Sequence, residues 1–447
     1  MGTLGAAAGE VDLVPPAGGW MSGFAARIEP SRETHDAVIA RALLLADERV
    51  TLAIVSCDLI GLTASAVARI RVRVEVATGG GIPGSHILIA CTHTHSGPAS
   101  MPFRGVMGHV DEAWLHSAIR KIADMVAGLF ERLRPARIAS ATTVVTGVGY
   151  NRQDASRPID DRLRVMAVEA FDGTAIATLV NYATHPVVLG PGNLLYSADY
   201  PGEVARRIAG TRGGIALFLQ GASGDADPLV YRDRGWGKGT FDDARRIGDR
   251  LAEAAIEVLE ALGRAAWREE PGIRIVRETL GVPVDPLPTE AEVRAMIAGF
   301  EADRQKARGA AGNRIDELIA EAMLDWAAEA KDAALHPPAA RTLPAELFVA
   351  AIAGTIFVGV PFETYAGIAL EIARLVQPEN LFFAGYANGL FGYCPTRQAK
   401  DQGGYGPDGS SRWFPELVAP VGYGADELII DRATALAREL REERPSE

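Results

Sequence analysis

The sequence predicts an α/β protein with a large mixed β-sheet core, helices packed outside it and a functional site at the carboxyl ends of strands. Short apolar runs alternate with longer segments whose apolar residues recur at spacings of three and four, which is the pattern of strands joined by amphipathic helices. The apolar runs also end abruptly in His, Asp, Glu or Tyr. Because open α/β sheets bind their ligands at the carboxyl ends of strands, these polar residues are expected to form one site.

The expected strands are short apolar runs, each followed by polar residues that could carry chemistry. They are residues 50–56 before Asp58, residues 87–91 before His93, residues 175–180 before Asn181 and His185, residues 214–219 before Gln220 and Asp225, residues 354–360 before Glu363, and residues 381–384 before Asn388 and Tyr393.

Helical periodicity marks the segments between or after these runs. The expected helices are residues 64–77, 112–133, 200–208, 242–262, 365–375 and 425–440. Asp242 and Thr289 are expected N-caps, and Thr289 opens a capping box with Glu292. Residues 289–335 are rich in Ala, Glu, Lys and Arg and are broken by glycines, which predicts a helical hairpin appended to the core. This hairpin is either a solvated excursion without a role at the site, or a lid or dimer contact.

No internal repeat and no linker divides the chain, so residues 1–447 are expected to form a single catalytic domain that includes the hairpin. The net charge of −12 argues against nucleic acid and anionic lipid as partners, because both attract clustered Lys and Arg. A small-molecule substrate is the expected partner, with a homo-oligomer left open. No apolar stretch reaches membrane-spanning length, and residues 1–26 lack the Lys or Arg of a secretory signal, which predicts a cytoplasmic protein.

The segment Thr-His-Thr-His-Ser-Gly-Pro at residues 92–98 directly follows an expected strand. Residues i and i+2 of an extended segment point to the same side, so His93 is placed to bind a metal while His95 faces a substrate on that metal. Cys91 precedes them and is expected to be an inert buried thiol rather than a nucleophile paired with His93.

A catalytic zinc site uses nitrogen, sulfur or oxygen ligands and keeps one position for water or substrate. The candidate ligands at strand ends are His93, His185 and Glu363, with Tyr393 close behind. His95 is a candidate for transferring the proton or stabilising the oxyanion, and Tyr405 is a candidate for a second donor to that oxyanion.

Several charged residues have two interpretations each. Arg152 would supply a positive charge for a polar or anionic substrate group, or would form a structural ion pair with Asp160 or Asp161. The acidic residues that follow strands would either fix imidazole tautomers or make ordinary turn and cap contacts. These residues are Asp58, Asp199 and Asp225.

With these motifs, the sequence resembles the neutral, non-lysosomal ceramidase family over nearly its whole length. The strongest match is the segment at residues 92–98, and further matches lie at residues 11–16, 151–152, 181–185, 220–228 and 361–364. The resemblance implies a zinc ion held by His93, His185, Glu363 and Tyr393. It also implies a substrate-facing tyrosine twelve residues after Tyr393, which is Tyr405 here.

Phe362 replaces a glycine of the family pattern, residues 397–404 lack its paired glutamates, and a third departure matters most for the chemistry. Where the family has a serine in its Gly-Asp-x-Ser-Pro loop, this chain has Asp227. A carboxylate differs from a neutral hydroxyl in charge, so we expect a bacterial-type relative that is not a true ceramidase. Asp227 would bind an amino or hydroxyl group of a more polar substrate, or act as a general base. The family has an additional C-terminal immunoglobulin-like domain, and we expect no counterpart of it within these 447 residues.

The sequence therefore predicts a zinc-dependent hydrolase that uses metal-bound water to cleave an N-acyl amide bond of a small polar or amphiphilic molecule. The alternatives are a zinc esterase or lactonase, and a binding protein of the same scaffold without hydrolytic activity. A glycine-rich segment at residues 79–84 follows a helix and precedes a strand, which is the wrong order for a dinucleotide site. Ser223 lacks the nucleophile-elbow pattern, so a serine triad is not expected.

Overall fold

A computed structural model describes residues 3–270, 272–309, 312–338, 341–377, 380–415 and 417–442. Its central element is an eight-stranded mixed sheet with the strand order β11-β9-β8-β6-β1-β3-β4-β5. In chain order these strands are β1 (Gly5–Asp12), β3 (Ile39–Ala46), β4 (Thr51–Cys57), β5 (Ile87–Cys91), β6 (Arg134–Val144), β8 (Arg162–Ala170), β9 (Ala175–Tyr182) and β11 (Ile215–Gln220). The pairs β4–β5 and β9–β11 are parallel, whereas the other neighbours are antiparallel.

A second, four-stranded sheet covers one face of the first sheet. It consists of β13 (Arg274–Pro283), β14 (Thr342–Ile352), β15 (Thr355–Gly359) and β17 (Leu381–Ala384), of which β15 and β17 are parallel. Buried side chains from both sheets form one shared core, in which Leu43 and Ile54 of the large sheet join Phe348, Phe357 and Phe382 of the small one. The protein therefore has two sheets packed face to face.

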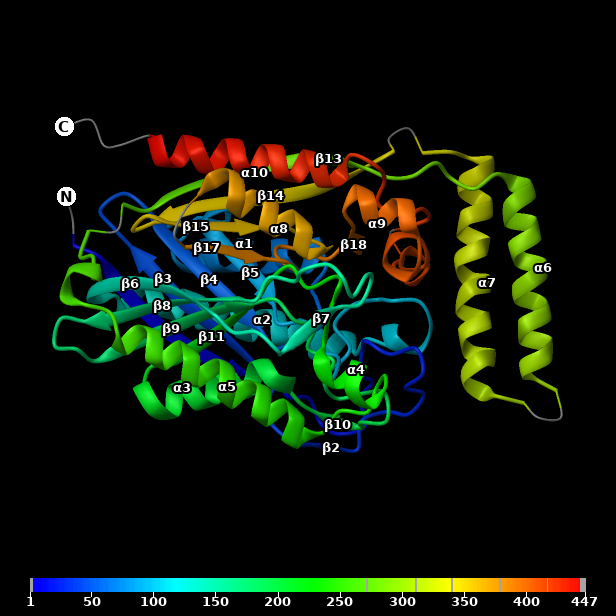
Figure 1. The fold of residues 1–447 in the computed structure, drawn as a ribbon, viewed down its shortest axis with the longest axis horizontal. Coiled ribbons are helices and arrows are strands. Elements are labelled where there is room, and N and C mark those ends of the chain that lie inside the picture. The colour runs from blue at the N-terminus through cyan, green and yellow to red at the C-terminus, as the bar shows by residue number, and fades with distance from the viewer. Residues whose placement is uncertain are drawn as a thin grey trace.

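Helices cover the outer face of each sheet, which gives four layers (Figure 1). The large sheet is covered by α1 (Ala64–Ala77), α2 (Glu112–Leu129), α3 (Asp199–Arg212) and α5 (Phe241–Glu260). The small sheet is covered by α8 (Ala366–Val376) and α10 (Ala425–Glu442). This arrangement confirms the predicted class, a mixed β-sheet core with helices outside it.

The expected strands all coincide with strands of the structure, to within two residues at each end. One predicted helix start is wrong. The N-cap of α5 is Thr240 rather than Asp242, because Thr240 and Asp243 form a reciprocal capping box in which each side chain accepts a hydrogen bond from the other residue's backbone N–H. The predicted capping box between Thr289 and Glu292 is present.

The helices α6 (Glu290–Ala307) and α7 (Arg314–Leu335) form a hairpin that stands beside the layered body (Figure 1). The contacts with the body come mainly from α7. Glu329 pairs with Arg104, the Trp326 indole N–H donates to the carbonyl oxygen of Val418 at 3.3 Å, and the Arg412 guanidinium lies 5.0 Å from the Trp326 ring. In the part of the chain that the structure describes, no helix is both long enough and apolar enough to cross a membrane.

Short elements lie at the sheet edge where the parallel strands end. The strand β7 (Gly149–Asn151) pairs with β12 (Ala226–Pro228), and β16 (Glu363–Thr364) pairs with β18 (Tyr393–Cys394). Other short strands and helices are β2 (Glu33–Thr34), β10 (Leu195–Tyr196), α4 (Leu229–Arg234) and α9 (Arg397–Gln402). Because β7, β12, β16 and β18 fold at this one edge, they bring together residues that are more than two hundred positions apart.

Candidate metal centre

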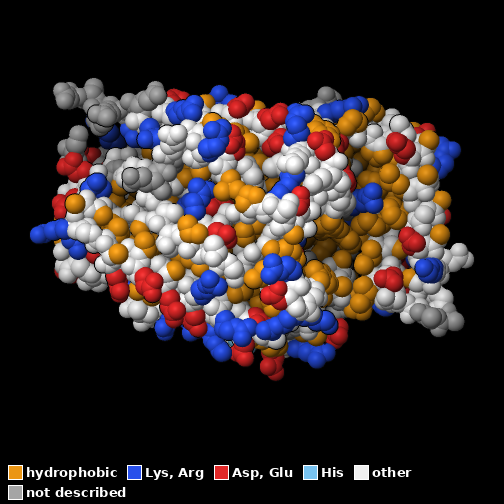
Figure 2. Space-filling view, viewed as in Figure 1, with side chains coloured by type: hydrophobic (Ala, Val, Ile, Leu, Met, Phe, Trp, Pro, Cys, Tyr) orange, Lys and Arg blue, Asp and Glu red, His pale blue; other side chains and the backbone are white. Residues whose placement is uncertain are grey.

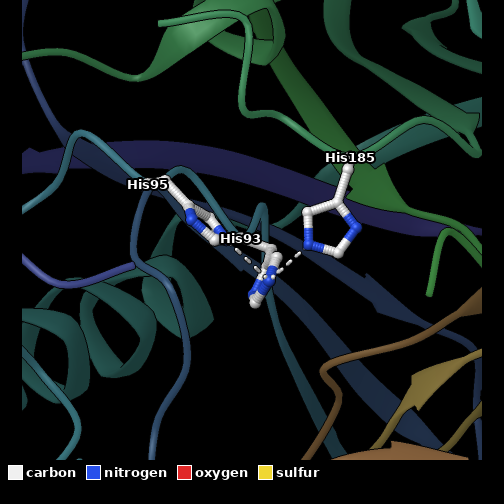
Figure 3. Close-up of side chains that lie close together, drawn as sticks. All are labelled: His93, His95 and His185. Carbon is white, nitrogen blue, oxygen red and sulfur yellow. Dashed lines mark hydrogen bonds between the residues drawn. The ribbon is translucent and has the colours of Figure 1, made fainter. Parts of the chain in front are cut away.

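Three histidines meet at the carboxyl ends of the parallel strands, and their rings are directed toward one another (Figure 3). His93 and His95 follow β5, and His185 follows β9. The His93 Nε2 atom lies 3.0 Å from His185 Nε2 and 3.1 Å from His95 Nε2. His93 and His185 are buried, whereas His95 is partly exposed. The placement of these residues at strand ends predicted that they converge, and the structure brings them together.

The geometry at His93 differs from the extended segment that the sequence predicted. His93 has a φ of 66°, in the left-handed region that few residues with a side chain adopt. The turn is held by two bonds: the backbone N–H donates to the Leu59 carbonyl at 2.9 Å, and the ring Nδ1 contacts the Ile60 carbonyl at 2.6 Å. Both imidazoles of the pair His93 and His95 still face the same point, but through this sharp turn rather than through strand alternation.

The outer ring nitrogens fix which inner nitrogens carry a lone pair. His93 Nδ1 contacts the Ile60 carbonyl, and His185 Nδ1 contacts the Ser223 carbonyl at 2.9 Å. Since a carbonyl oxygen only accepts, each Nδ1 carries the hydrogen and each Nε2 presents a lone pair. Two lone pairs 3.0 Å apart repel each other unless a proton or a metal ion lies between them. Carbonyls, not carboxylates, therefore orient these two rings.

Glu363 adds an oxygen to the same point. Its Oε2 atom lies 3.3 Å from His93 Nε2 and 3.4 Å from His185 Nε2. The side chain is buried, and no residue that the structure describes donates a hydrogen bond to Oε2. Ligands about 2.0–2.1 Å from a tetrahedral metal lie about 3.3 Å from one another. The nitrogen and oxygen donors, their spacing and the buried oxygen without a donor all fit a divalent transition metal such as zinc.

The imidazoles are also electrostatically suited to bind a cation. Burial lowers the pKa of His185 well below its ordinary value of 6.5, and the positive charge of Arg152 lowers it further. Desolvation by the surrounding protein, followed by the neighbouring His93, lowers the pKa of His95 in the same direction. Both rings are therefore neutral near pH 7, so that neither has to lose a proton before its nitrogen lone pair is available.

Tyr393 lies beside the cluster because its strand β18 pairs in register with Glu363 on β16. The side chain is buried, and its hydroxyl accepts a hydrogen bond of 2.9 Å from the Arg152 guanidinium. The ring of Tyr405 packs edge to face on that of Tyr393, with 5.8 Å between the centroids. Metal coordination by Tyr393 and oxyanion contact by Tyr405 remain predictions.

Arg152 pairs with Asp227, with 3.0 Å between Nη1 and Oδ1, and its Nη2 also donates to the Gly224 carbonyl at 2.8 Å. The alternative partners expected from the sequence, Asp160 and Asp161, are wrong for Arg152, because Asp160 instead binds Arg162 and Arg164. Burial raises the pKa of Asp227, and the charge of Arg152 opposes this rise. The two predicted catalytic residues thus form one ion pair next to Tyr393.

The three strand-end aspartates make turn and ion-pair contacts rather than contacts with imidazoles. Asp58 binds Arg41, and Asp199 accepts from the backbone N–H groups of Leu189 and Tyr200. Asp225 accepts from the Asn151 amide and from the backbone N–H of Ala366. None of these contacts fixes an imidazole tautomer, since the Nδ1 atoms of His93 and His185 bond to backbone carbonyls instead.

Several residues around the cluster were not identified from the sequence. Tyr386 stacks on His93 with 4.0 Å between the ring centroids, and it follows β17 closely, so the strand-end rule could have found it. Arg27 is buried and donates from Nη1 to the carbonyl oxygens of Ser22 at 3.1 Å and His95 at 2.8 Å. Nothing in the sequence around Arg27 indicates this contact, because it depends on a loop of the first thirty residues folding over residues 92–98.

Gly23 sets the position of His95. It has a φ of 110°, and a Cβ atom at this position would lie 2.5 Å from the His95 ring. Gly23→Ala is therefore expected to displace the imidazole. With the proton-transfer role predicted for His95, turnover should fall on the order of 10²-fold, the typical effect of moving a catalytic group by about 1 Å. Metal content, measured by elemental analysis, should not change.

Gly18→Ala is the matched control for this prediction. Gly18 has a similar φ of 95°, but a Cβ atom there would meet nothing within 4 Å. The control variant carries the backbone strain without the collision, so its turnover should stay within about threefold of the original. Equal losses in both variants would contradict a specific role for Gly23 in placing His95.

Fold and cluster together define an α/β protein with a candidate metal centre at the carboxyl ends of its strands. No family model matches the chain. Neutral ceramidase of Pseudomonas aeruginosa is 22% identical to it, in an alignment that covers 94% of this chain and 70% of that protein. Neutral ceramidase of Drosophila melanogaster is also 22% identical, over 62% of this chain and about half (47%) of that protein.

Solved structures agree with these sequence matches. The crystal structure of the Pseudomonas aeruginosa neutral ceramidase superposes with a TM-score of 0.70 at 18% identity, and covers 98% of this chain and 75% of that one. A structure of ceramidase complexed with C2 superposes with a TM-score of 0.71 at 17% identity, and covers 100% of this chain and 77% of that one. The chain is thus related to the neutral ceramidases in sequence and in fold.

Proposed function

We propose that the protein is a zinc-dependent hydrolase that cleaves an N-acyl amide bond of a small polar or amphiphilic substrate. The observation that carries the proposal is the convergence of imidazole Nε2 atoms and the Glu363 Oε2 atom, which lacks a donor, on one point at the sheet edge. The relationship to neutral ceramidases supports the amide as the bond that is cleaved.

The residues that would hold the metal are His93, His185 and Glu363, with Tyr393 as the fourth ligand. A bound zinc ion would polarise the substrate carbonyl and lower the pKa of water toward about 7. Nitrogen and oxygen donors at this spacing favour zinc over the hard cations Mg²⁺ and Ca²⁺, which prefer oxygen ligands throughout.

His95 is the residue proposed to transfer the proton. Its neutral imidazole is partly exposed, so a substrate reaches it while the fully buried His93 and His185 stay enclosed. It would accept a proton as the nucleophile forms and return it to the departing amine nitrogen. Arg27 holds the backbone carbonyl of His95, and Gly23 leaves room for its ring.

Arg152 and Asp227 would act on the polar part of the substrate. Arg152 fixes the Tyr393 hydroxyl, and its charge is balanced by Asp227. Because this pair is neutral overall, it favours a neutral or hydrogen-bonding amine portion over a strongly anionic one. Tyr405, beside Tyr393, would be an additional donor to the developing oxyanion.

Metal analysis and chelation test this proposal. The purified protein should contain about one zinc ion per chain. Treatment with 1,10-phenanthroline should abolish cleavage of N-acyl amides, and added zinc should restore it. Paired amide and ester substrates with the same acyl group distinguish an amidase from an esterase. Full activity of a protein from which all metal has been removed would refute the mechanism.

A further inference from the structure

Trp236 is a large apolar side chain that the fold holds at the surface. Its exposed fraction is 59%, and it lies between Gly235 and Gly237, whose φ values are 101° and 72°. This turn packs closely against the loop that contains Gly190, since a Cβ atom at Gly190 would lie 2.3 Å from the carbonyl oxygen of Gly237. The backbone on both sides of Trp236 is therefore constrained, while the indole itself stays largely exposed.

Aromatic contacts connect Trp236 to the metal cluster. Its ring lies edge to face on Phe24 with 5.6 Å between the centroids, and Phe24 lies edge to face on His95 at 5.0 Å. His95 is the partly exposed member of the three histidines, whereas His93 and His185 are buried. A substrate that reaches the cluster from the side of His95 consequently passes Phe24 and Trp236.

A polar group also borders the cluster. The Tyr393 hydroxyl, the Arg152 guanidinium and the Asp227 carboxylate form one connected group next to Glu363. The side of Trp236, by contrast, includes a small apolar cluster of Phe24, Val187 and Tyr231. Apolar and polar side chains therefore both border the centre, and they suit the two parts of an amphiphilic molecule.

The surface view agrees with an apolar approach. Figure 2 shows hydrophobic side chains gathered in the hollow between the layered body and the α6–α7 hairpin. Helix α4, which ends two residues before Trp236, lies on the side of the body that faces this hairpin (Figure 1). Not every exposed aromatic residue has such a position: Phe171, 49% exposed, lies in the turn before β9, at the end of that strand opposite His185.

We propose that Trp236 and Phe24 form the subsite for the apolar acyl arm of the substrate, and that Trp236 sets the preference for acyl length. This inference rests on the proposed amide hydrolysis and adds the orientation of the substrate. The acyl arm lies along Phe24 and Trp236 beside His95, and the polar amine part lies toward Arg152 and Asp227. Burial of an acyl chain against the indole then removes the exposed apolar area from water.

The test is a series of p-nitroanilides that carry acetyl, hexanoyl or dodecanoyl groups. Trp236→Ala should lower kcat/KM for the dodecanoyl substrate by on the order of tenfold or more, with a loss that shrinks as the acyl group is shortened. Trp236→Phe should recover most of the loss, since it keeps an aromatic surface. Phe171→Ala is the matched control, and it should retain the original length profile.

A binding measurement tests the acyl subsite independently of hydrolysis. Titration with dodecanoate should perturb the tryptophan fluorescence of the original protein and of Phe171→Ala, and the change should be lost in Trp236→Phe. This result would support the subsite even if none of the anilides were cleaved, an outcome that would count against the proposed function alone. A loss that is equal for all acyl lengths, or a fluorescence change that persists in Trp236→Phe, would overturn the inference.

Discussion

His185→Ala is expected to lose the bound metal and the hydrolytic activity together. His185 supplies one of the two Nε2 atoms that lie 3.0 Å apart and also contacts Glu363 Oε2 at 3.4 Å, so its removal breaks the donor set on two sides. Metal catalysis contributes several kcal/mol to the stabilisation of the transition state, and each 1.4 kcal/mol or so is a factor of ten. We therefore expect turnover to fall on the order of 10⁴-fold or more, with a zinc content close to zero.

His95→Ala is the informative comparison, because the two imidazoles lie in the same cluster but are proposed to do different things. His95→Ala should retain the zinc and lose turnover on the order of 10²–10⁴-fold, the usual contribution of a positioned acid or base. Elemental analysis and steady-state kinetics on both variants separate the two roles. Zinc loss in His95→Ala would make His95 a ligand, and zinc retention in His185→Ala would remove His185 from the ligand set.

Much of the fold follows from hydrophobic pattern, and the parts that do not follow have a physical explanation. The predicted strands include β4, β5, β9 and β11, which are apolar on both faces because helices cover one side and the second sheet covers the other. Strand β1, in contrast, has the sequence Gly-Ala-Ala-Ala-Gly-Glu-Val-Asp, which has little intrinsic preference for a strand. It becomes a strand because β3 and β6 pair with it on both sides.

The site shows the same division between what is local in sequence and what is not. His93, His95, His185 and Glu363 directly follow or begin strands, so the strand-end rule was enough to group them. The oxygens of Ile60 and Ser223 that orient the rings are backbone atoms, and no residue type marks them in advance. The position of Trp236 likewise depends on a contact between two glycine-containing loops, which only the folded chain reveals.

A buried ion pair supports the loop that holds His93. Asp58 is completely buried, and its Oδ2 accepts from Arg41 Nη1 at 2.7 Å and from the Ile39 backbone N–H at 3.1 Å. The two residues that follow Asp58 provide the carbonyls to which the His93 backbone and ring are bonded. Burial raises the pKa of Asp58 above its ordinary value of 3.8, and the charge of Arg41 opposes that rise. Removal of Arg41 therefore leaves a buried carboxylate without a cation.

Arg41→Met is expected to lower the free energy of unfolding by about 3–5 kcal/mol, the typical cost of breaking a buried pair from one side. Because the folded-state pKa of Asp58 then rises further above that of the unfolded chain, the deficit should grow as the pH is raised from about 5 to about 8. Chemical denaturation of the variant at both pH values measures this change.

Two further variants are the controls. Arg41→Met with Asp58→Asn should recover much of the loss, because the second substitution removes the stranded charge. Arg32→Met, which breaks the exposed pair with Glu29, should cost no more than about 1 kcal/mol. Equal losses for the buried and the exposed pair would contradict the expected cost of leaving the Asp58 carboxylate buried without a cation.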